Sequence, residues 1–347
     1  MTKISVVMSV HNGLPYLRDC LASLEDQTET DVEFILVDDA STDGSLDVLK
    51  RFAKSNQHTH LIVNKQNKGL TKALNQALEV ASGTYIARID ADDMCYPTRF
   101  EKQLRFMEDH PQIVACASGY RMVDDRGKTL RTARRELKDW QIRWLLSFNP
   151  PAPHPTYFFQ RLDPNGRAIR YNEDFATAQD YDLWSRLSTL GETYVMPEVL
   201  IDYRRHSSAI TSAKRDEQAE NCAKIGLVNL KKRYPDDVLK QMSTFVDFFA
   251  YKQKADPKSI AAAVHGADTM LRADTTLSGH DSRWLKRMTA GLLAEGILSR
   301  GQGLTHLRTI LAFLFQARAY LPWLLVAVAK EPGLMIKSLQ GFFATRQ

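Results

Sequence analysis

The sequence predicts an α/β fold, in which a mostly parallel sheet carries helices on both faces and a helical C-terminal region follows. Three observations predict this class. Short β-branched runs alternate with amphipathic helical segments over residues 4–89, polar turn segments follow the strands, and helical patterns dominate beyond Asp216. Such alternation is typical of right-handed βαβ units, which build a parallel sheet covered on both faces. We expect a sheet domain at 1–215 and a helical region at 216–347.

The elements of the expected sheet domain follow one another at short intervals. A β-branched run at 4–9 predicts the first strand, and Leu17, Leu21 and Leu24 recur at helical spacing within a helix predicted at 14–27. The same reasoning predicts the later elements, with strands at 32–37, 61–63 and 84–89 and helices at 45–52 and 70–81. From about 95 to 215 the pattern mixes strand, loop and helix, and turns at Tyr234-Pro235 and Asp256-Pro257 interrupt the later helices.

Polar, turn-rich segments follow the first, second and fourth predicted strands. They contain His11 and Asn12, then Asp38 and Asp39, then a group of acids that begins at Asp90. Ligands of open parallel sheets bind beyond the carboxyl ends of the strands, so we expect these segments to converge on one crevice. The glycine-rich dinucleotide motif and the P-loop motif are both missing, so the sequence predicts no glycine cradle for a nucleotide.

The acids of the third segment suit a divalent cation. In extended geometry Asp90 and Asp92 point to the same side about 6–7 Å apart. Ligation by oxygen alone favours Mg²⁺ or Mn²⁺. A simpler explanation stays open, because Asp90, Asp92 and Asp93 can form a solvated turn ahead of the helix expected near Pro97. Likewise, the residues after Asp39 can cap the helix that follows them.

Five motifs follow one another within residues 1–215. They are VVMSVHNG, LVDDASTDGS, NKGLTKALNQAL, ARIDADDM and TAQDYDLWSRL. In this order they resemble the family 2 glycosyltransferases, whose catalytic domain has the GT-A fold. The resemblance implies an inverting transfer of a sugar from a nucleoside diphosphate sugar, with UDP as the expected nucleotide and Mn²⁺ or Mg²⁺ as the cofactor. The acceptor would be a hydroxyl of a glycan or of a lipid-linked molecule in surface polysaccharide or glycolipid synthesis.

The resemblance assigns the sugar donor to the strand-end loops. The residues expected to bind it are Ser9, His11, Asn12, Asp38, Asp39, Lys68, Gly69, Asp90 and Arg204. Within this set, Ser9 and Asp39 would contact the base with Asp38 beside them, while Lys68 and Gly69 lie in the loop below the ribose and phosphates. Arg204 belongs to a basic segment that resembles the one closing over the diphosphate.

The same resemblance assigns the metal and the catalytic base. Asp92 resembles the principal metal ligand, and Asp93 and His206 are further candidates. Asp180 matches the catalytic base, although many relatives have Glu where this chain has Gln179. An acid in the first turn of a helix is also favoured by the helix dipole, and both explanations of Asp180 can hold together.

The acceptor is expected on the side of His154 and Trp184, which resemble residues beside the family's acceptor pocket. Two other functions compete with sugar transfer. A nucleotidyltransferase would need a phosphate loop rich in glycine and lysine near the first strand, and SVHNGLPYL offers none. A catalytically inactive scaffold that only binds nucleotide sugars is disfavoured because Asp39, Asp92 and Asp180 are all present.

The net charge of +5 is concentrated at the end of the chain, where residues 297–347 hold six bases and one acid. The rest of the chain holds equal numbers of basic and acidic residues, which argues against a nucleic-acid partner. The amphipathic pattern at 304–321 suits the surface of an anionic membrane. It is equally compatible with packing on the catalytic domain or on a second copy in a homo-oligomer. The uncharged run at 319–329 is too short to span a bilayer, which takes about 20 residues.

The expected location is the cytoplasm, peripherally on the inner face of the cytoplasmic membrane. Cys20, Cys95, Cys116 and Cys222 are far apart in the sequence and form no CxxC pair, which predicts neither a disulfide framework nor a zinc site. The apolar run before His11 is shorter than the core of a signal peptide, about 7–15 residues, so we expect an unexported protein.

Overall fold

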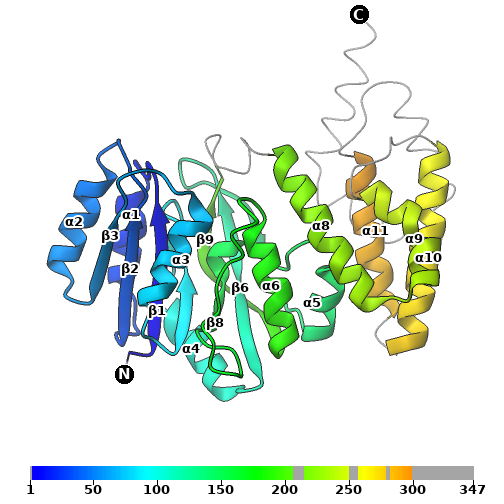
Figure 1. Cartoon of the computed structure of the whole chain (residues 1–347), viewed down its shortest axis with the longest axis horizontal. Helices are drawn as coiled ribbons and strands as arrows, with labels where there is room; N and C mark the ends of the chain where they lie inside the picture. Colours follow the sequence, from blue (N-terminus) through cyan, green and yellow to red (C-terminus); the bar gives the residue numbers. More distant parts are fainter. Residues whose placement is uncertain (1, 206–214, 250–256, 279–281, 299–347) are drawn as a thin grey trace, which may run out of the picture. The chain divides into compact units, whose positions relative to one another are not determined.

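The protein is described by a computed structural model, and the structure describes residues 2–205, 215–249, 257–278 and 282–298. The chain divides into two compact units, Met1–Gly226 and Leu227–Gln347. The first unit contains a nine-stranded sheet with the strand order β3-β2-β1-β4-β8-β6-β9-β5, and β7 pairs with β6. In Figure 1 the colours follow the sequence, from blue at the N-terminus, and most of these elements are labelled.

The first four strands are parallel, as the alternating pattern predicts. They are β1 Ile4–Val10, β2 Val32–Asp38, β3 Thr59–Val63 and β4 Tyr85–Arg88, connected by the helices α1 Leu17–Glu25, α2 Ser45–Ser55 and α3 Leu70–Val80. The chain first moves outward from β1 to β3 and then returns to place β4 on the other side of β1. The reversal between β1 and β4 is the point at which sheets of this kind bind ligands.

Alternation along β1 divides its side chains between the two faces of the sheet. Ile4, Val6, Met8 and Val10 are fully buried in one cluster with residues of α1, α2 and the helix α4 Arg99–Asp109. Right-handed crossovers place α1 and α2 on that face, and the return crossover places α3 on the other. The sheet is therefore covered on both faces, which confirms the predicted α/β class.

The second half of the sheet mixes parallel and antiparallel pairs. Its strands are β5 Met94–Cys95, β6 Ile113–Val123, β7 Thr129–Ala133, β8 Phe158–Gln160 and β9 Glu192–Arg204. The long strands β6 and β9 run parallel, whereas β8 lies antiparallel to both β4 and β6. The helices α5 Asp139–Leu145 and α6 Gln179–Leu190 and the short turn η1 His154–Thr156 complete this region.

Helices make up the described part of the C-terminal region, as predicted. They are α8 Arg215–Arg233, α9 Asp236–Phe249, α10 Pro257–Ser278 and α11 Ser282–Leu298. Inside the second unit, Asp274 of α10 accepts hydrogen bonds from Arg233 and Tyr234, at 2.7 Å from each. Among the described helices none is long and apolar enough to cross a membrane. The predicted amphipathic helix at 304–321 lies outside the described residues.

Candidate active site

Two strand-end loops are tied together where the donor nucleotide is predicted to bind. The β1–α1 loop donates to the β2–α2 loop through the Asn12 N–H, which reaches the Ser41 hydroxyl at 3.0 Å. In return, the Asn12 side-chain oxygen accepts from the Thr42 N–H at 2.8 Å. The His11 ring lies 2.8 Å from the Asp39 carbonyl, and Ser9 lies beside Val37 in the parallel register. The loops therefore form one rigid edge of the crevice.

The adjacent acids Asp38 and Asp39 are both 1% exposed but have different partners. The Asp39 carboxylate accepts hydrogen bonds from the Asn64 amide at 2.8 Å, from the Lys68 N–H at 2.9 Å and from the Gly69 N–H at 2.9 Å. Asp39 thus holds the loop before α3 in place. The Oδ1 atom of Asp38 is buried and has no hydrogen-bond partner among the described residues.

Replacing Asp39 with Ala should lower the free energy of unfolding by about 2–4 kcal/mol, because two partly buried backbone N–H groups and the Asn64 amide lose their acceptor. Urea denaturation followed by tryptophan fluorescence measures this loss. The matched control is Asp43→Ala. Asp43 is exposed and its carboxylate accepts from the N–H groups of Leu14 and Ser45, so its loss should cost about 1 kcal/mol. Equal losses in the two variants would contradict the structural role of Asp39.

The acids after β4 form the predicted carboxylate cluster. One oxygen from each of Asp90, Asp92 and Asp93 lies within 4.8 Å of the others. Asp93 is 1% exposed, its Oδ1 accepts from the Arg204 N–H at 2.7 Å, and its Oδ2 has no hydrogen-bond partner among the described residues. Burial and the charges of Asp92 and Asp90 raise the pKa of Asp93 well above its ordinary value. The cluster therefore holds more negative charge than the described surroundings neutralise.

Arg204, at the end of β9, supports this cluster from behind. Its Nε donates to the Asp92 carbonyl at 2.9 Å, and its Nη1 lies 3.3 and 3.2 Å from the carbonyls of Asp124 and Asp125. Its guanidinium also lies over the Tyr16 ring, 4.5 Å from the centroid. Arg204 thus orders the backbone that carries the acids. His206, predicted near the metal, lies outside the described residues.

Asp180 occupies the first turn of α6, which begins after Ala178 with its backbone in the left-handed region at φ +60°. Burial raises the pKa of Asp180, and the negative charge of Asp90 adds to this effect. The nearby Arg88 charge and the backbone N–H of Tyr181 oppose it. The charge of Asp90, which the motifs assign to the donor, thus acts on the acid predicted for catalysis, although the two residues are 90 positions apart in the sequence.

An aromatic wall lies on the Asp180 side of the site, and we define it as His154, Tyr157, Tyr171 and Trp184. The His154 Nε2 lies 2.6 Å from the Tyr171 hydroxyl, and the Tyr157 and Trp184 ring centroids are 4.4 Å apart. Burial and the Arg88 charge lower the pKa of His154 well below its ordinary value, so its ring is neutral. Trp184 is fully buried, and the other three residues of the wall are buried as well, so this predicted acceptor residue lies inside the protein.

Three residues to which the sequence analysis assigned no role belong to this site. Arg88 is a buried cation at the end of β4, and its Nη1 forms an ion pair with Asp90. Burial raises the pKa of Tyr203 of β9, and the charges of Asp90, Asp93, Asp92 and Asp180 add to this effect. Asn64 anchors Asp39. Arg88 could have been noticed in the sequence, because it is the one charged residue of the strand Tyr85–Arg88.

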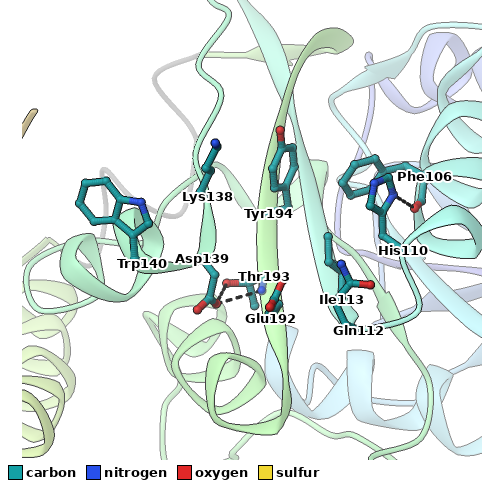
Figure 2. Close-up of a pocket in the computed structure, with 10 residues that line it drawn as sticks. All are labelled: Phe106, His110, Gln112, Ile113, Lys138, Asp139, Trp140, Glu192, Thr193 and Tyr194. Atoms are coloured by element: carbon teal, nitrogen blue, oxygen red, sulfur yellow. Dashed lines mark hydrogen bonds between the residues drawn. The ribbon is translucent and has the colours of Figure 1, made fainter. Parts of the chain in front are cut away.

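A second depression lies at the opposite ends of β6 and β9, away from the acids. It has a volume of about 420 Å³ and is lined by residues that include Phe106, Trp140, Glu192 and Tyr194. Figure 2 shows that these side chains come from α4, α5 and the start of β9. Within it, the Asp139 carboxylate accepts hydrogen bonds from the Thr193 N–H and hydroxyl groups.

Comparison with known proteins agrees with this geometry. A family model described as "Glycosyl transferase family 2" matches residues 5–164. The amylovoran biosynthesis glycosyltransferase AmsE of Erwinia amylovora is 32% identical over 213 residues, which cover 60% of this chain and 79% of AmsE. The chain belongs to glycosyltransferase family 2. An uncharacterized glycosyltransferase of Haemophilus influenzae is 30% identical over 235 residues, or 65% of this chain and 73% of that protein.

Solved structures confirm the GT-A fold of this family 2 glycosyltransferase. S. aureus TarS 1-349 in complex with UDP-GlcNAc has a TM-score of 0.55 at 17% identity, covering 92% of this chain and 90% of that chain. The mannosyltransferase PcManGT of Pyrobaculum calidifontis, in complex with GDP-Man and Mn²⁺, has a TM-score of 0.53 at 17% identity, covering 93% and 86%. At these identities the likeness shows the fold alone.

Proposed function

We propose that the protein is an inverting glycosyltransferase that moves a sugar from a nucleoside diphosphate sugar to an acceptor hydroxyl during polysaccharide synthesis. The observation that carries this proposal is the cluster of Asp90, Asp92 and Asp93 at the β1–β4 reversal, and the effect of the Asp90 charge on Asp180 supports it. The name of the amylovoran biosynthesis relative supports the polysaccharide assignment. Structures of the same fold with UDP-GlcNAc and with GDP-Man support a nucleotide-sugar donor.

The donor nucleoside is assigned to the edge formed by the β1–α1 and β2–α2 loops. Asp38 is the proposed acceptor for a base N–H, because its Oδ1 is buried without a hydrogen-bond partner among the described residues. Asp39 then acts by positioning Lys68 and Gly69, to whose backbone it is already bonded. Ser9, His11 and Asn12 complete the edge, and UDP is the nucleotide we propose.

The carboxylates after β4 fit a divalent cation such as Mn²⁺ or Mg²⁺. The unpartnered Asp93 Oδ2 and the mutual repulsion of the three acids both favour a cation among them. Asp92 and Asp93 are the proposed ligands, since Asp90 is already paired with Arg88. The cation would offset the negative charge that develops on the departing nucleoside diphosphate. The structure with GDP-Man and Mn²⁺ supports this choice of ion.

Asp180 is the proposed general base. It accepts the proton of the acceptor hydroxyl as the oxygen attacks the anomeric carbon from the face opposite the leaving group, which inverts the configuration. Its raised pKa makes it a better proton acceptor than an ordinary Asp. The neutral His154 and Tyr171 bond to each other in the adjacent wall.

The rate of transfer should fall as the pH is lowered through the pKa of Asp180. Because burial raises this pKa above its ordinary value of 3.8, protonation of the base should begin at a higher pH than for an exposed Asp. The check is kcat/KM measured between pH 4.5 and 8 at saturating Mn²⁺, with UDP binding measured in parallel. A rate that stays constant over this range while binding also stays constant would contradict the role of Asp180.

The proposed function is tested by a thermal-shift panel of UDP-GlcNAc, GDP-Man and dTDP-linked sugars, each with Mn²⁺, with Mg²⁺ or with EDTA. A donor that binds the folded protein at 100 times its Kd stabilises it by about 2.7 kcal/mol and raises the melting temperature. Release of the nucleoside diphosphate from the bound donor then separates an enzyme from an inactive scaffold. No shift with any donor would overturn the proposal.

The acceptor and the membrane are assigned from the sequence. A glycan or lipid-linked acceptor is proposed for the side of His154 and Asp180. Peripheral contact with an anionic membrane, as expected of a protein at the inner face of the cytoplasmic membrane, is proposed for residues 304–347, which lie outside the described residues. Binding to vesicles with and without anionic lipid tests the membrane contact, and loss of binding after removal of 304–347 is the expected result.

A further inference from the structure

The second depression, at the starts of β6 and β9, lies far from the acids of the candidate active site. β6 runs for 11 residues from Ile113, which lines the depression, to Val123. Val123 is the register partner of Arg204, whose N–H donates to Asp93 of the carboxylate cluster. At about 3.3 Å per residue, the two places are about 30 Å apart along the strand. A ligand held in the depression therefore touches none of these acids.

Backbone hydrogen bonds fix the elements that carry the depression. The Glu192 N–H donates to the Gln112 carbonyl at 3.1 Å, which joins the starts of β6 and β9. Leu137, just before α5, exchanges two backbone hydrogen bonds with Val195 of β9, at 3.1 and 2.9 Å. The start of α5 is thereby anchored to β9. The depression is thus formed without a ligand, as small-molecule sites usually are.

Aromatic side chains make up much of the lining. Phe106, Trp140 and Tyr194 are each partly exposed. The Phe106 ring centroid lies 4.9 Å from that of Tyr194 and 4.5 Å from that of His110, on which the Phe106 ring stacks. Figure 2 shows Trp140 on the other side of Tyr194 from this stacked pair. The lining therefore offers rigid aromatic surface that the protein covers only in part.

Polar side chains line the same depression. Those of Gln112, Lys138 and Glu192 are exposed there. Lys138 and Glu192 carry opposite charges, and Asp139 is paired with Arg143. Because the charge around the depression is nearly balanced, a phosphorylated or strongly charged ligand is disfavoured. A purely apolar ligand is also disfavoured, since it would cover these polar groups without offering them hydrogen bonds.

We propose that the second depression is a binding subsite for a neutral oligosaccharide, whose sugar rings stack on the aromatic side chains and whose hydroxyl groups bond to the polar ones. A pyranose ring has faces of C–H groups and a rim of hydroxyls, which matches aromatic rings flanked by an amide, an ammonium and a carboxylate. The volume of about 420 Å³ suits a small ligand. The ligand class rests on the proposed function, because an enzyme that extends a polysaccharide meets such chains as acceptor and as product.

The experiment measures binding of maltopentaose, cellopentaose and chitopentaose at millimolar concentrations, by calorimetry and by tryptophan fluorescence, without donor or metal. We expect at least one of these neutral oligosaccharides to bind. Trp140→Ala should weaken that binding by at least about 10-fold, because truncation of a tryptophan in a contact surface is among the most costly changes. Binding of UDP with Mn²⁺ should stay unchanged in this variant, since Trp140 is remote from the strand-end loops.

The matched control is Trp284→Ala, which removes a partly exposed tryptophan from α11 in the second unit. It should leave oligosaccharide binding unchanged. Equal binding by Trp140→Ala and the unaltered protein would overturn the proposal, and so would failure of all three oligosaccharides to bind. If Trp140→Ala does not fold, the exposed substitution Gln112→Ala replaces it in the same test. A dimer in solution that either variant dissociates would assign the depression to a second copy of the chain and overturn the proposal as well.

The donor panel separates this test from that of the proposed function. A protein that binds a nucleotide sugar but none of the oligosaccharides keeps the function and loses the subsite. A protein that binds an oligosaccharide through Trp140 but no donor keeps the subsite and loses the function. The two failures are therefore distinguishable.

Discussion

Replacing Asp180 with Asn should lower the rate of sugar transfer by about 10³-fold, because a positioned general base contributes about 10²- to 10⁴-fold to a reaction of this kind. The affinity for the donor should change little, since Asp180 lies at the start of α6 and the donor is assigned to the strand-end loops. The rate is measured as product formation at saturating donor, and the affinity by calorimetry with UDP and Mn²⁺.

The same substitution should not lower the melting temperature. Burial raises the pKa of Asp180, which means that the folded state disfavours its ionised form relative to the unfolded chain. This acid therefore contributes a cost that grows as the pH rises above its unfolded pKa, and a neutral Asn removes that cost. We expect an equal or higher melting temperature at pH 7, so a loss of activity cannot be ascribed to unfolding.

The matched control for Asp180→Asn is Asp182→Asn, which alters another acid in the first turn of α6. Asp182 accepts from the Arg186 Nε at 2.8 Å, so its carboxylate serves a pair within the helix. Transfer by this variant should stay within about threefold of the unaltered enzyme, since a partly exposed pair of this kind contributes little. Asp180→Asn turnover close to that of the control would show that the base lies elsewhere.

Replacing Asp92 with Ala should weaken metal-dependent donor binding by at least about 100-fold. Removing even an outer partner of a metal ligand costs about 10- to 100-fold in metal affinity, so loss of a direct ligand should cost no less. Chelation by EDTA should have the same effect on the unaltered enzyme, and adding Mn²⁺ should reverse it. Calorimetry with UDP at several Mn²⁺ concentrations measures both effects.

The control for Asp92→Ala is Asp109→Asn, at the exposed end of α4 in an ion pair with Arg105. It should leave the Mn²⁺ dependence unchanged. Asp92→Ala should also lower the pKa of Asp93, because it removes one of the charges that raise it. An Asp92→Ala protein that binds UDP with unaltered Mn²⁺ dependence would exclude Asp92 as a ligand.

Periodicity predicted the parallel half of the sheet to within a few residues. The run at 4–9 corresponds to Ile4–Val10, and the helix at 70–81 corresponds to Leu70–Val80. These elements are local, since a buried strand or an amphipathic helix shows its pattern in its own residues. The mixed half was not resolved in the same way, because β8 has three residues and β5 has two, too few to establish a period.

The candidate site was predictable where a motif follows a strand. Asp90, Asp92 and Asp93 are so close in the sequence that a single turn brings their carboxylates together. The difference in hydrogen bonding between Asp38 and Asp39 was not predictable. The partners of Asp39 come from the segment before α3, about 25–30 residues later in the sequence. The burial of Trp184 likewise depends on how α6 packs against the residues that follow η1.

By itself the sequence determined the α/β class, the family and the acids that can carry the chemistry, because these depend on short-range patterns and on side-chain type. Only the tertiary structure decided which charges act on one another. It pairs Arg88 with Asp90, commits Asp39 and Arg204 to the protein's own backbone, and leaves Asp38 and Asp93 each with an unpartnered oxygen among the described residues. Burial and distance set these interactions, and both arise from packing between segments that are far apart in the chain.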